Sequence, residues 1–205
     1  GITQITPADI ASAREMGFVI KLLAIADLTA DEKGVVARVH PAMVPRTHPL
    51  ASVRDAFNAV FVEAESAGEM MFYGRGAGGA PTASAVLGDL VAAARNRVNR
   101  TRSHPTDPYT GIVPRPIAEA RTCYAVAIEV EDRPGVLASI ATVFAENGVS
   151  INTVRQDESD NGARLNVRTH IATEANLSAT VDALRALDVV NRVAGVIRVE
   201  GVDGA

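Results

Sequence analysis

The stretch Asp132-Arg133-Pro134-Gly135-Val136-Leu137 decides how the second half of this chain folds. Before it, apolar residues at 124, 126, 128 and 130 alternate with smaller or polar ones, which predicts a strand with one buried face. After it, apolar residues recur at helical spacing until Gly148, and a proline near a helix start is favoured. The stretch therefore marks the turn at which a strand ends and a helix begins.

The residues that follow complete a recognisable order of elements. Val149–Arg155 reads as a strand, Asp160-Asn161-Gly162 is a strong hairpin signal, and alternation over 163–171 predicts the strand that returns. Apolar residues at 177, 181, 184 and 187 mark a second helix, and residues 196–199 a final short strand. The order βαββαβ is the ferredoxin-like pattern.

The strand-to-helix turn also suits the binding of a free amino acid. Free N–H groups at the helix start attract a carboxylate, while the Asp132 side chain accepts from an ammonium group. The simpler interpretation is a helix start without a ligand.

The first hundred residues mix helices and strands. Thr6-Pro7-Ala8-Asp9 predicts a helix start, with a capping hydroxyl and a proline in the first turn, and Gly17 ends that helix. Asp31–Gly34 reads as a turn that makes the strands on either side antiparallel. A later helix runs from Pro81 to about Arg97, with an apolar stripe. The predicted strands cover residues 18–26, 35–39, 57–62 and 70–73.

A glycine-rich turn, Gly74–Thr82, leads into the later helix. Its glycines let the backbone approach a phosphate, an ammonium-bearing substrate or a flat cofactor ring. It is not a dinucleotide-binding fingerprint, because no parallel βαβ unit follows it. The alternative is a turn whose glycines only permit close helix–sheet packing.

Composition excludes several classes of function. The 205 residues carry a net charge of −4 and no cluster of basic residues, so we expect no nucleic-acid partner. No apolar run approaches the ~20 residues of a membrane span. His40, His48 and His104 lack metal-binding spacing, and we expect no metal site. The single cysteine, Cys123, reads as a buried core residue and fits a reducing cytoplasm.

Four prolines divide the chain between Thr101 and Arg121. Proline removes backbone donors and disfavours helix, so this segment is predicted to be an extended linker. The sequence thus predicts a first domain over residues 1–103, a linker over 104–121 and a second domain over 122–205.

The second domain resembles the ACT regulatory domain. The resemblance covers Thr122 to about Gly201 and rests on the 132–137 stretch, on the run from Phe144 to Asn152, and on the order of elements. It implies an effector site shared by two paired copies. One copy provides Asp132, Pro134, Gly135, Val136 and Leu137, and the other provides Ser150, Ile151 and Asn152.

The first domain resembles the C-terminal part of the homoserine dehydrogenase catalytic domain. The matching residues include Ile5–Ile10, Ile20–Ala24 and Val39-His40-Pro41, and Gly74–Val86 is the strongest match. An ACT domain after it resembles the actinobacterial type. The fold class expected is therefore α+β: part of an α/β substrate and dimerisation domain with a mainly antiparallel sheet, followed by a ferredoxin-like βαββαβ ACT domain.

The resemblance implies a fragment of an NAD(P)-dependent enzyme that reduces aspartate semialdehyde to homoserine. In this family the nucleotide-binding domain, the catalytic lysine and the substrate-binding acids precede a segment like Gly1-Ile2-Thr3, so we assign no catalytic residue here and expect this chain to be inactive. The resemblance places Gly76, Ala77 and Gly78 near the nicotinamide, although we expect no tight cofactor binding by this chain.

The resemblance further implies a cytoplasmic homo-oligomer, at least a dimer, that senses a free amino acid. Threonine is the first choice, and isoleucine and lysine stay open, as does the preference between NAD and NADP. The alternative is a stand-alone, non-catalytic amino-acid-sensing protein, and a weaker one is the ACT-bearing part of another amino-acid enzyme. An upstream Gly-x-Gly-x-x-Gly βαβ unit would favour the dehydrogenase.

Overall fold

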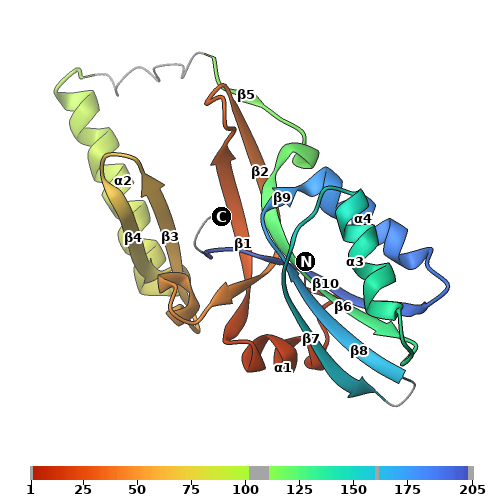
Figure 1. Cartoon of the computed structure of the whole chain (residues 1–205). Helices are drawn as coiled ribbons and strands as arrows, with labels where there is room; N and C mark the ends of the chain where they lie inside the picture. Colours follow the sequence, from red (N-terminus) through yellow and green to blue (C-terminus); the bar gives the residue numbers. More distant parts are fainter. Residues whose placement is uncertain (1, 102–110, 160–161, 203–205) are drawn as a thin grey trace. The chain divides into compact units, whose positions relative to one another are not determined.

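The computed structural model describes residues 2–101, 111–159 and 162–202 (Figure 1). The chain forms two compact units. One contains residues 1–46 together with 111–205, and the other contains residues 47–110.

The second half of the chain has the predicted ferredoxin-like order. Strand β6 leads into helix α3, strands β7 and β8 form an antiparallel hairpin, and helix α4 returns the chain to β10, which pairs antiparallel with β6. The short strand β9 pairs with β6. The bounds are β6 Arg121–Val130, α3 Val136–Glu146, β7 Ile151–Ser159, β8 Gly162–Thr169, β9 Ala172–Thr173, α4 Glu174–Arg185 and β10 Val190–Val199.

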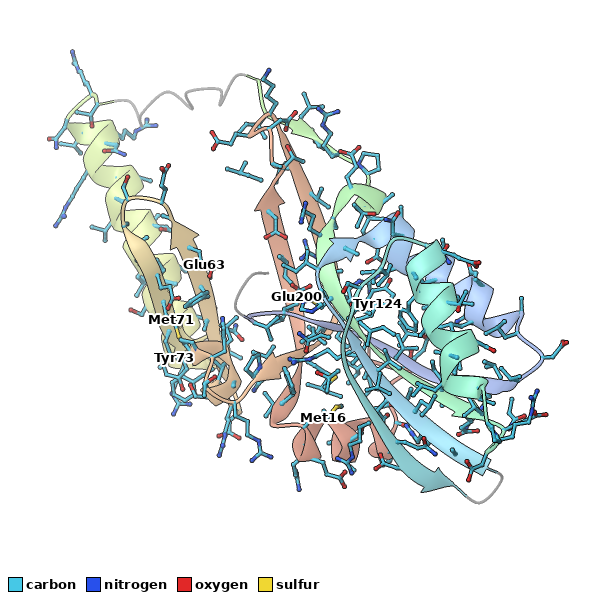
Figure 2. All side chains as sticks on the ribbon, in the orientation of Figure 1. Met16, Glu63, Met71, Tyr73, Tyr124 and Glu200 are labelled. Atoms are coloured by element: carbon cyan, nitrogen blue, oxygen red, sulfur yellow. The ribbon has the colours of Figure 1, made fainter. Side chains whose placement is uncertain are left out.

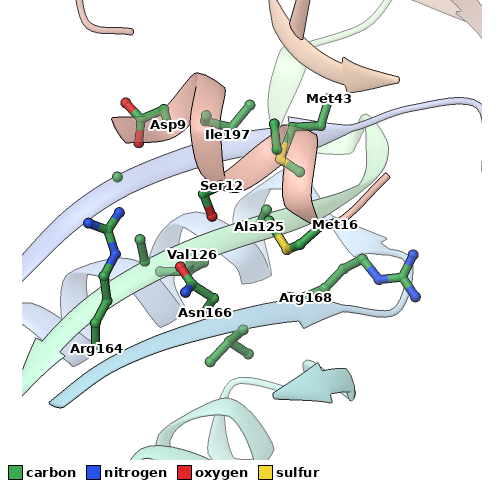
Figure 3. A pocket seen from close by; sticks show the side chains of 14 residues that line it. Asp9, Ser12, Met16, Met43, Ala125, Val126, Arg164, Asn166, Arg168 and Ile197 are labelled. Carbon is green, nitrogen blue, oxygen red and sulfur yellow. The ribbon is translucent and has the colours of Figure 1, made fainter. Parts of the chain in front are cut away.

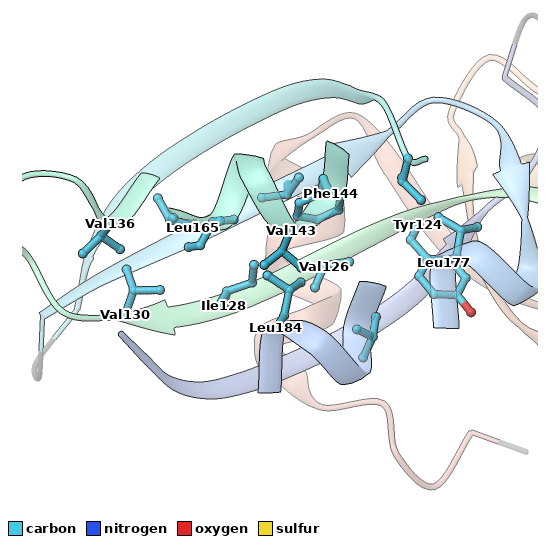
Figure 4. Packing of buried hydrophobic residues seen from close by; sticks show 14 of the residues in the cluster. Tyr124, Val126, Ile128, Val130, Val136, Val143, Phe144, Leu165, Leu177 and Leu184 are labelled. Atoms are coloured by element: carbon cyan, nitrogen blue, oxygen red, sulfur yellow. The ribbon is translucent and has the colours of Figure 1, made fainter. Parts of the chain in front are cut away.

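The two helices pack on one face of this sheet and enclose a continuous apolar core (Figure 4). The alternating residues of β6 point into it, and Ile128 is fully buried. Ile140 and Phe144 enter from α3, and Leu177 and Leu184 from α4. The apolar residues that recur every second position in the strands and about every 3.6 positions in the helices are therefore buried in one core, which confirms the ferredoxin-like interpretation.

The N-terminal hairpin extends the same sheet. Helix α1 (Pro7–Glu15) starts with a capping box between Thr6 and Asp9, and Gly17 takes a φ of 84° after it. Strands β1 (Phe18–Leu28) and β2 (Gly34–Pro45) pair antiparallel, as predicted. Strand β2 then pairs parallel with β10, so the sheet runs in the order β1-β2-β10-β6-β8-β7.

These pairings group the chain differently from the division predicted from its sequence. That division kept residues 1–46 apart from the ACT segment, whereas the structure places both in one unit. The physical reason is that β2 covers the edge of β10, which would otherwise present unpaired backbone groups. Residues 47–110 form the other unit.

The other unit holds a two-stranded hairpin and a long helix. The hairpin pairs β3 (Phe57–Ala64) with β4 (Gly68–Arg75), after the short 3-10 helix η1 (Pro49–Ser52). Helix α2 covers Gly79–Val98, close to the predicted bounds. Its predicted apolar stripe is exposed: none of the twenty residues of α2 is buried among the described residues.

The predicted linker is partly structured where it is described. Val113–Pro114 forms the short strand β5, parallel to β2, and Ile117–Glu119 forms the 3-10 helix η2. Strand β5 is extended, as predicted for the linker, and the 3-10 turn of η2 is a local departure from an extended backbone. Pro105 and Pro108, like Asp160 and Asn161 of the predicted hairpin turn, lie outside the described residues. No helix in the described part is long and apolar enough to cross a membrane.

Candidate functional site

The turn between β6 and α3 presents an open helix N-terminus. Gly135 precedes α3 with a φ of 92°, a left-handed conformation that glycine adopts without a steric penalty. The Val136 N–H donates to the Arg133 carbonyl at 3.4 Å, but no side chain caps the helix, so the following N–H groups of its first turn can bind an anion. Pro134 and Gly135 are exposed.

Asp132 stands beside this helix start with its carboxylate available. The side chain is exposed, and within the described ranges it makes no hydrogen bond or ion pair. The neighbouring Arg133 is paired with Glu131 instead, at 2.5 Å between Nε and Oε2. A negative group next to a positive helix end is the arrangement that a zwitterion requires.

The two apolar residues of the predicted turn have different environments. The side chain of Val136 is 4% exposed and packs in the core, so it does not line a ligand site directly. Leu137 is 48% exposed and faces outward from the first turn of α3. Of this pair, Leu137 alone offers its side chain to a bound molecule.

The second predicted group lies where β7 begins. Ser150 is exposed, and its carbonyl oxygen accepts the backbone N–H of His170 at 2.8 Å. Ile151 is half-buried against the core. Asn152 is exposed, and its Oδ1 accepts from Arg168 Nη2 at 2.5 Å and from the Thr153 hydroxyl at 2.7 Å. The Ser150 hydroxyl is therefore the less engaged of the two polar side chains.

One chain does not bring the two groups together. Asp132 precedes α3 and Ser150 follows it, and the helix of 11 residues between them rises about 16 Å (Figure 1). A bound amino acid is much shorter than that separation. A site that uses both groups must take one from each of two chains.

The glycine-rich turn leads from β4 into α2 and exposes its backbone. Gly76, Ala77 and Gly78 are exposed, and Gly78 has a φ of 124°. A Cβ at Gly76 would lie 1.7 Å from Nδ2 of Asn58, so a larger residue here would have to displace the Asn58 side chain of β3. The exposed glycines thus allow a ligand to approach the backbone closely, and Gly76 also allows the turn to lie close to β3.

A small recess lies between α1 and the sheet (Figure 3). Asp9, Arg164 and Arg168 are among its lining residues, and its volume is about 20 Å³. That volume holds about one water molecule. The recess is too small for a free amino acid, and Asp9 is already engaged in the capping box of α1.

A buried polar cluster was missed in the sequence. Arg38 and His40 of β2, both 5% exposed, lie against Glu200, which follows β10 and is labelled in Figure 2. Arg38 Nε donates to His40 Nε2 at 3.2 Å, and because arginine only donates, His40 is neutral with its proton on Nδ1. In the sequence, the only sign of this cluster was that Arg38 and His40 stand two residues apart in an apolar strand.

Burial changes the ionisation of this cluster. Desolvation lowers the pKa of His40, which keeps the imidazole neutral near pH 7. Desolvation also raises the pKa of Glu200, and the nearby Arg38 guanidinium opposes that shift. Cys123, buried as predicted, has a raised thiol pKa for the same reason, with Glu200 adding to it.

Two family models match separate parts of the chain. The family model "Homoserine dehydrogenase" matches residues 1–91, and the family model "ACT domain" matches residues 124–189.

Full-length relatives extend the similarity across both segments. A homoserine dehydrogenase of Corynebacterium glutamicum is 51% identical over 203 residues, which are 98% of this chain and 46% of that protein. One from Mycobacterium tuberculosis is 55% identical over 210 residues, covering 98% and 48%. The chain thus spans about half the length of the curated relatives it matches.

Solved structures agree with the fold. The crystal structure of a homoserine dehydrogenase from Thiobacillus denitrificans superposes with a TM-score of 0.84 at 35% identity, over 98% of this chain and 46% of that one. A homoserine dehydrogenase from S. aureus gives 0.64 at 27% identity, over 98% and 47%.

Proposed function

We propose that this chain, which belongs to the homoserine dehydrogenases and carries their ACT domain, binds a free amino acid between two copies of that domain and so regulates the enzyme of which it forms part. The observation that carries the proposal is the pair of half-sites at opposite ends of α3. One half offers an open helix start and the Asp132 carboxylate, which has no partner among the described residues, and the other offers a hydroxyl at Ser150.

The proposed ligand contacts follow from charge. The α-carboxylate of the amino acid accepts from the first-turn N–H groups of α3, near Leu137. Its ammonium group donates to Asp132. Pro134 and Gly135 shape the turn, and Val136 supports it from the core.

Threonine is the proposed effector. From the paired chain, the Ser150 hydroxyl reaches the side chain of the ligand, and Ile151 contacts its methyl group. Asn152, held by Arg168, fixes the edge of the site. A site that hydrogen-bonds a hydroxyl rejects an analogue without one, because its own polar groups would be left unpaired. Isoleucine and lysine are the competing effectors.

For the complete enzyme we propose the reduction of aspartate semialdehyde to homoserine, in the biosynthesis of threonine, methionine and isoleucine, in the cytoplasm. A bound NAD(P) would supply the hydride. The exposed backbone of Gly76, Ala77 and Gly78 would border the nicotinamide, and the match over residues 1–91 supports this role. No residue of this chain is proposed as the proton-transfer group.

The chain should self-associate, because the proposed site is incomplete in a monomer. Light scattering at micromolar concentration should give the mass of two chains or more. Strand β7 is an edge strand of the sheet, and such edges are paired or covered in stable assemblies. A mass equal to a single chain would contradict the proposed site.

Threonine should bind the purified chain, and the two half-sites should both matter. In calorimetric titrations, Asp132→Ala and Ser150→Ala should each weaken threonine binding by about tenfold or more, since each leaves a polar group of the ligand unpaired. Asp182→Ala, in an exposed i,i+3 pair on α4, is the matched control and should bind like the wild type.

The same titration, repeated with isoleucine, lysine and serine, identifies the effector class. Binding heat from threonine alone supports the proposal. Binding heat from lysine alone would show that lysine, and not threonine, is the effector. Threonine binding that is unchanged in both variants would place the site elsewhere.

A further inference from the structure

The backbone connection between the β1–β2 hairpin and the ACT sheet is short. Strands β10 and β2 pair at only two positions, Arg198 with Ala42 and Val199 with Met43. One further bond runs from the N–H of Glu200 to the carbonyl of Met43, at 3.0 Å. By contrast, β10 pairs with β6 along its whole length, from Val190 to Val199. Side-chain contacts therefore supplement the short backbone pairing in holding the hairpin on the sheet.

A buried carboxylate joins three strands at this point. Arg38 Nη2 donates to both oxygens of Glu200, at 3.2 and 3.3 Å, and the Thr122 hydroxyl of β6 donates to Oε1 at 3.1 Å. The side chain of Arg38 is 1% exposed and that of Glu200 is 12% exposed. Arg38 Nη1 also bonds Asp27 of β1. A buried ion pair with its remaining hydrogen bonds satisfied is costly to break on one side only.

A second set of contacts carries the connection to helix α4. Glu174, the first residue of α4, accepts from the Tyr124 hydroxyl at 2.8 Å and from Arg198 Nε at 3.1 Å. Arg198 lies in β10, two residues before Glu200. The backbone from Arg198 to Glu200 joins the two sets of contacts, which together connect helix α4 with both strands of the hairpin.

We propose that Arg38, Glu200 and Thr122, continued by Arg198 and Glu174, form the joint through which the ACT domain acts on the β1–β2 hairpin. This inference rests on the proposed function in one respect: the signal it would transmit is amino-acid binding. The joint itself is defined by geometry alone, and its residues lie outside the proposed effector site. Arg38 and Glu200 act as positioning residues.

Hydrogen exchange of the whole chain tests the joint. In Glu200→Gln, the amides of residues 36–44 should exchange about tenfold faster or more than in the wild type, because Arg38 loses its buried charge partner. The amides of residues 163–167, in β8, should keep their protection. The matched control is Glu129→Gln, which removes the Arg192–Glu129 ion pair between β10 and β6 and leaves the contacts of the hairpin intact.

Three outcomes decide the proposal. Faster exchange confined to residues 36–44 in Glu200→Gln, and absent in Glu129→Gln, supports it. Exchange of residues 36–44 in Glu200→Gln at a rate within about twofold of that in Glu129→Gln overturns the proposal. A loss of protection in β8 as large as that in residues 36–44 also overturns it. If Glu200→Gln does not fold, Thr122→Val removes one donor to the same carboxylate and is judged by the same criterion.

Threonine separates the joint from the effector proposal. In the wild type, saturating threonine should change the protection of residues 36–44, and in Glu200→Gln it should bind while leaving them unchanged. An equal response of these amides in both proteins overturns the joint. If threonine does not bind even the wild type, the proposed effector fails, and the exchange comparison between Glu200→Gln and Glu129→Gln still decides the joint.

Discussion

The purified 205-residue chain is expected to show no oxidation of homoserine with NADP or NAD. The described residues contain no parallel βαβ unit: the parallel pairs in the sheet are those of β2 with β5 and with β10. Of the two lysines, Lys21 lies in β1 and Lys33 in the turn after it, and neither is near the glycine-rich turn in sequence. Exposed backbone at Gly76–Gly78 is not sufficient to hold a cofactor and move a proton.

The assay needs a positive and a negative reference. A full-length homoserine dehydrogenase measured in parallel sets the detectable rate, and the chain is produced in a host that lacks its own enzyme. Turnover that coelutes with the chain through two chromatographic steps would refute the prediction.

Replacing Leu184 by alanine should lower the free energy of unfolding by about 2–5 kcal/mol. Leu184 is 0% exposed and packs between α4 and the sheet, so truncation leaves a cavity. A typical domain is stable by only about 5–15 kcal/mol, so this loss is a large fraction of the total stability.

The control is the same substitution at Leu137, which is 48% exposed on α3. Leucine and alanine have similar helix propensities, so Leu137→Ala should cost less than about 1 kcal/mol. Denaturant unfolding followed by circular dichroism measures both. Equal destabilisation by the two variants would show that the core is not where the structure places it.

The ACT fold could be predicted from the sequence because its signals are local. Alternation along β6 and β8 and helical spacing in α3 and α4 reflect burial within each element. Strand ends were less predictable. Strand β2 continues from the expected end at Val39 to Pro45, because pairing with β1 and β10 holds the chain extended past the prolines.

The polar cluster could not be predicted, because it joins residues that are remote in sequence. Arg38 and Glu200 are 162 positions apart, and nothing near either residue indicates the other. The residues of the proposed effector site show the opposite limit of prediction from sequence. Its residues were visible as motifs, but the separation of Asp132 from Ser150 by the length of α3 emerges only in three dimensions.

The shared effector site is the central claim, and mixed dimers test it most directly. Asp132→Ala and Ser150→Ala chains, coexpressed in equal amounts, form mixed dimers in which one of the two sites has both residues intact. With random pairing in a twofold-symmetric dimer, about a quarter of all sites should bind threonine with wild-type affinity. Calorimetry should therefore detect these sites in the mixture and none in either variant alone. A mixture with no wild-type sites, although the wild-type chain binds threonine, would contradict the account.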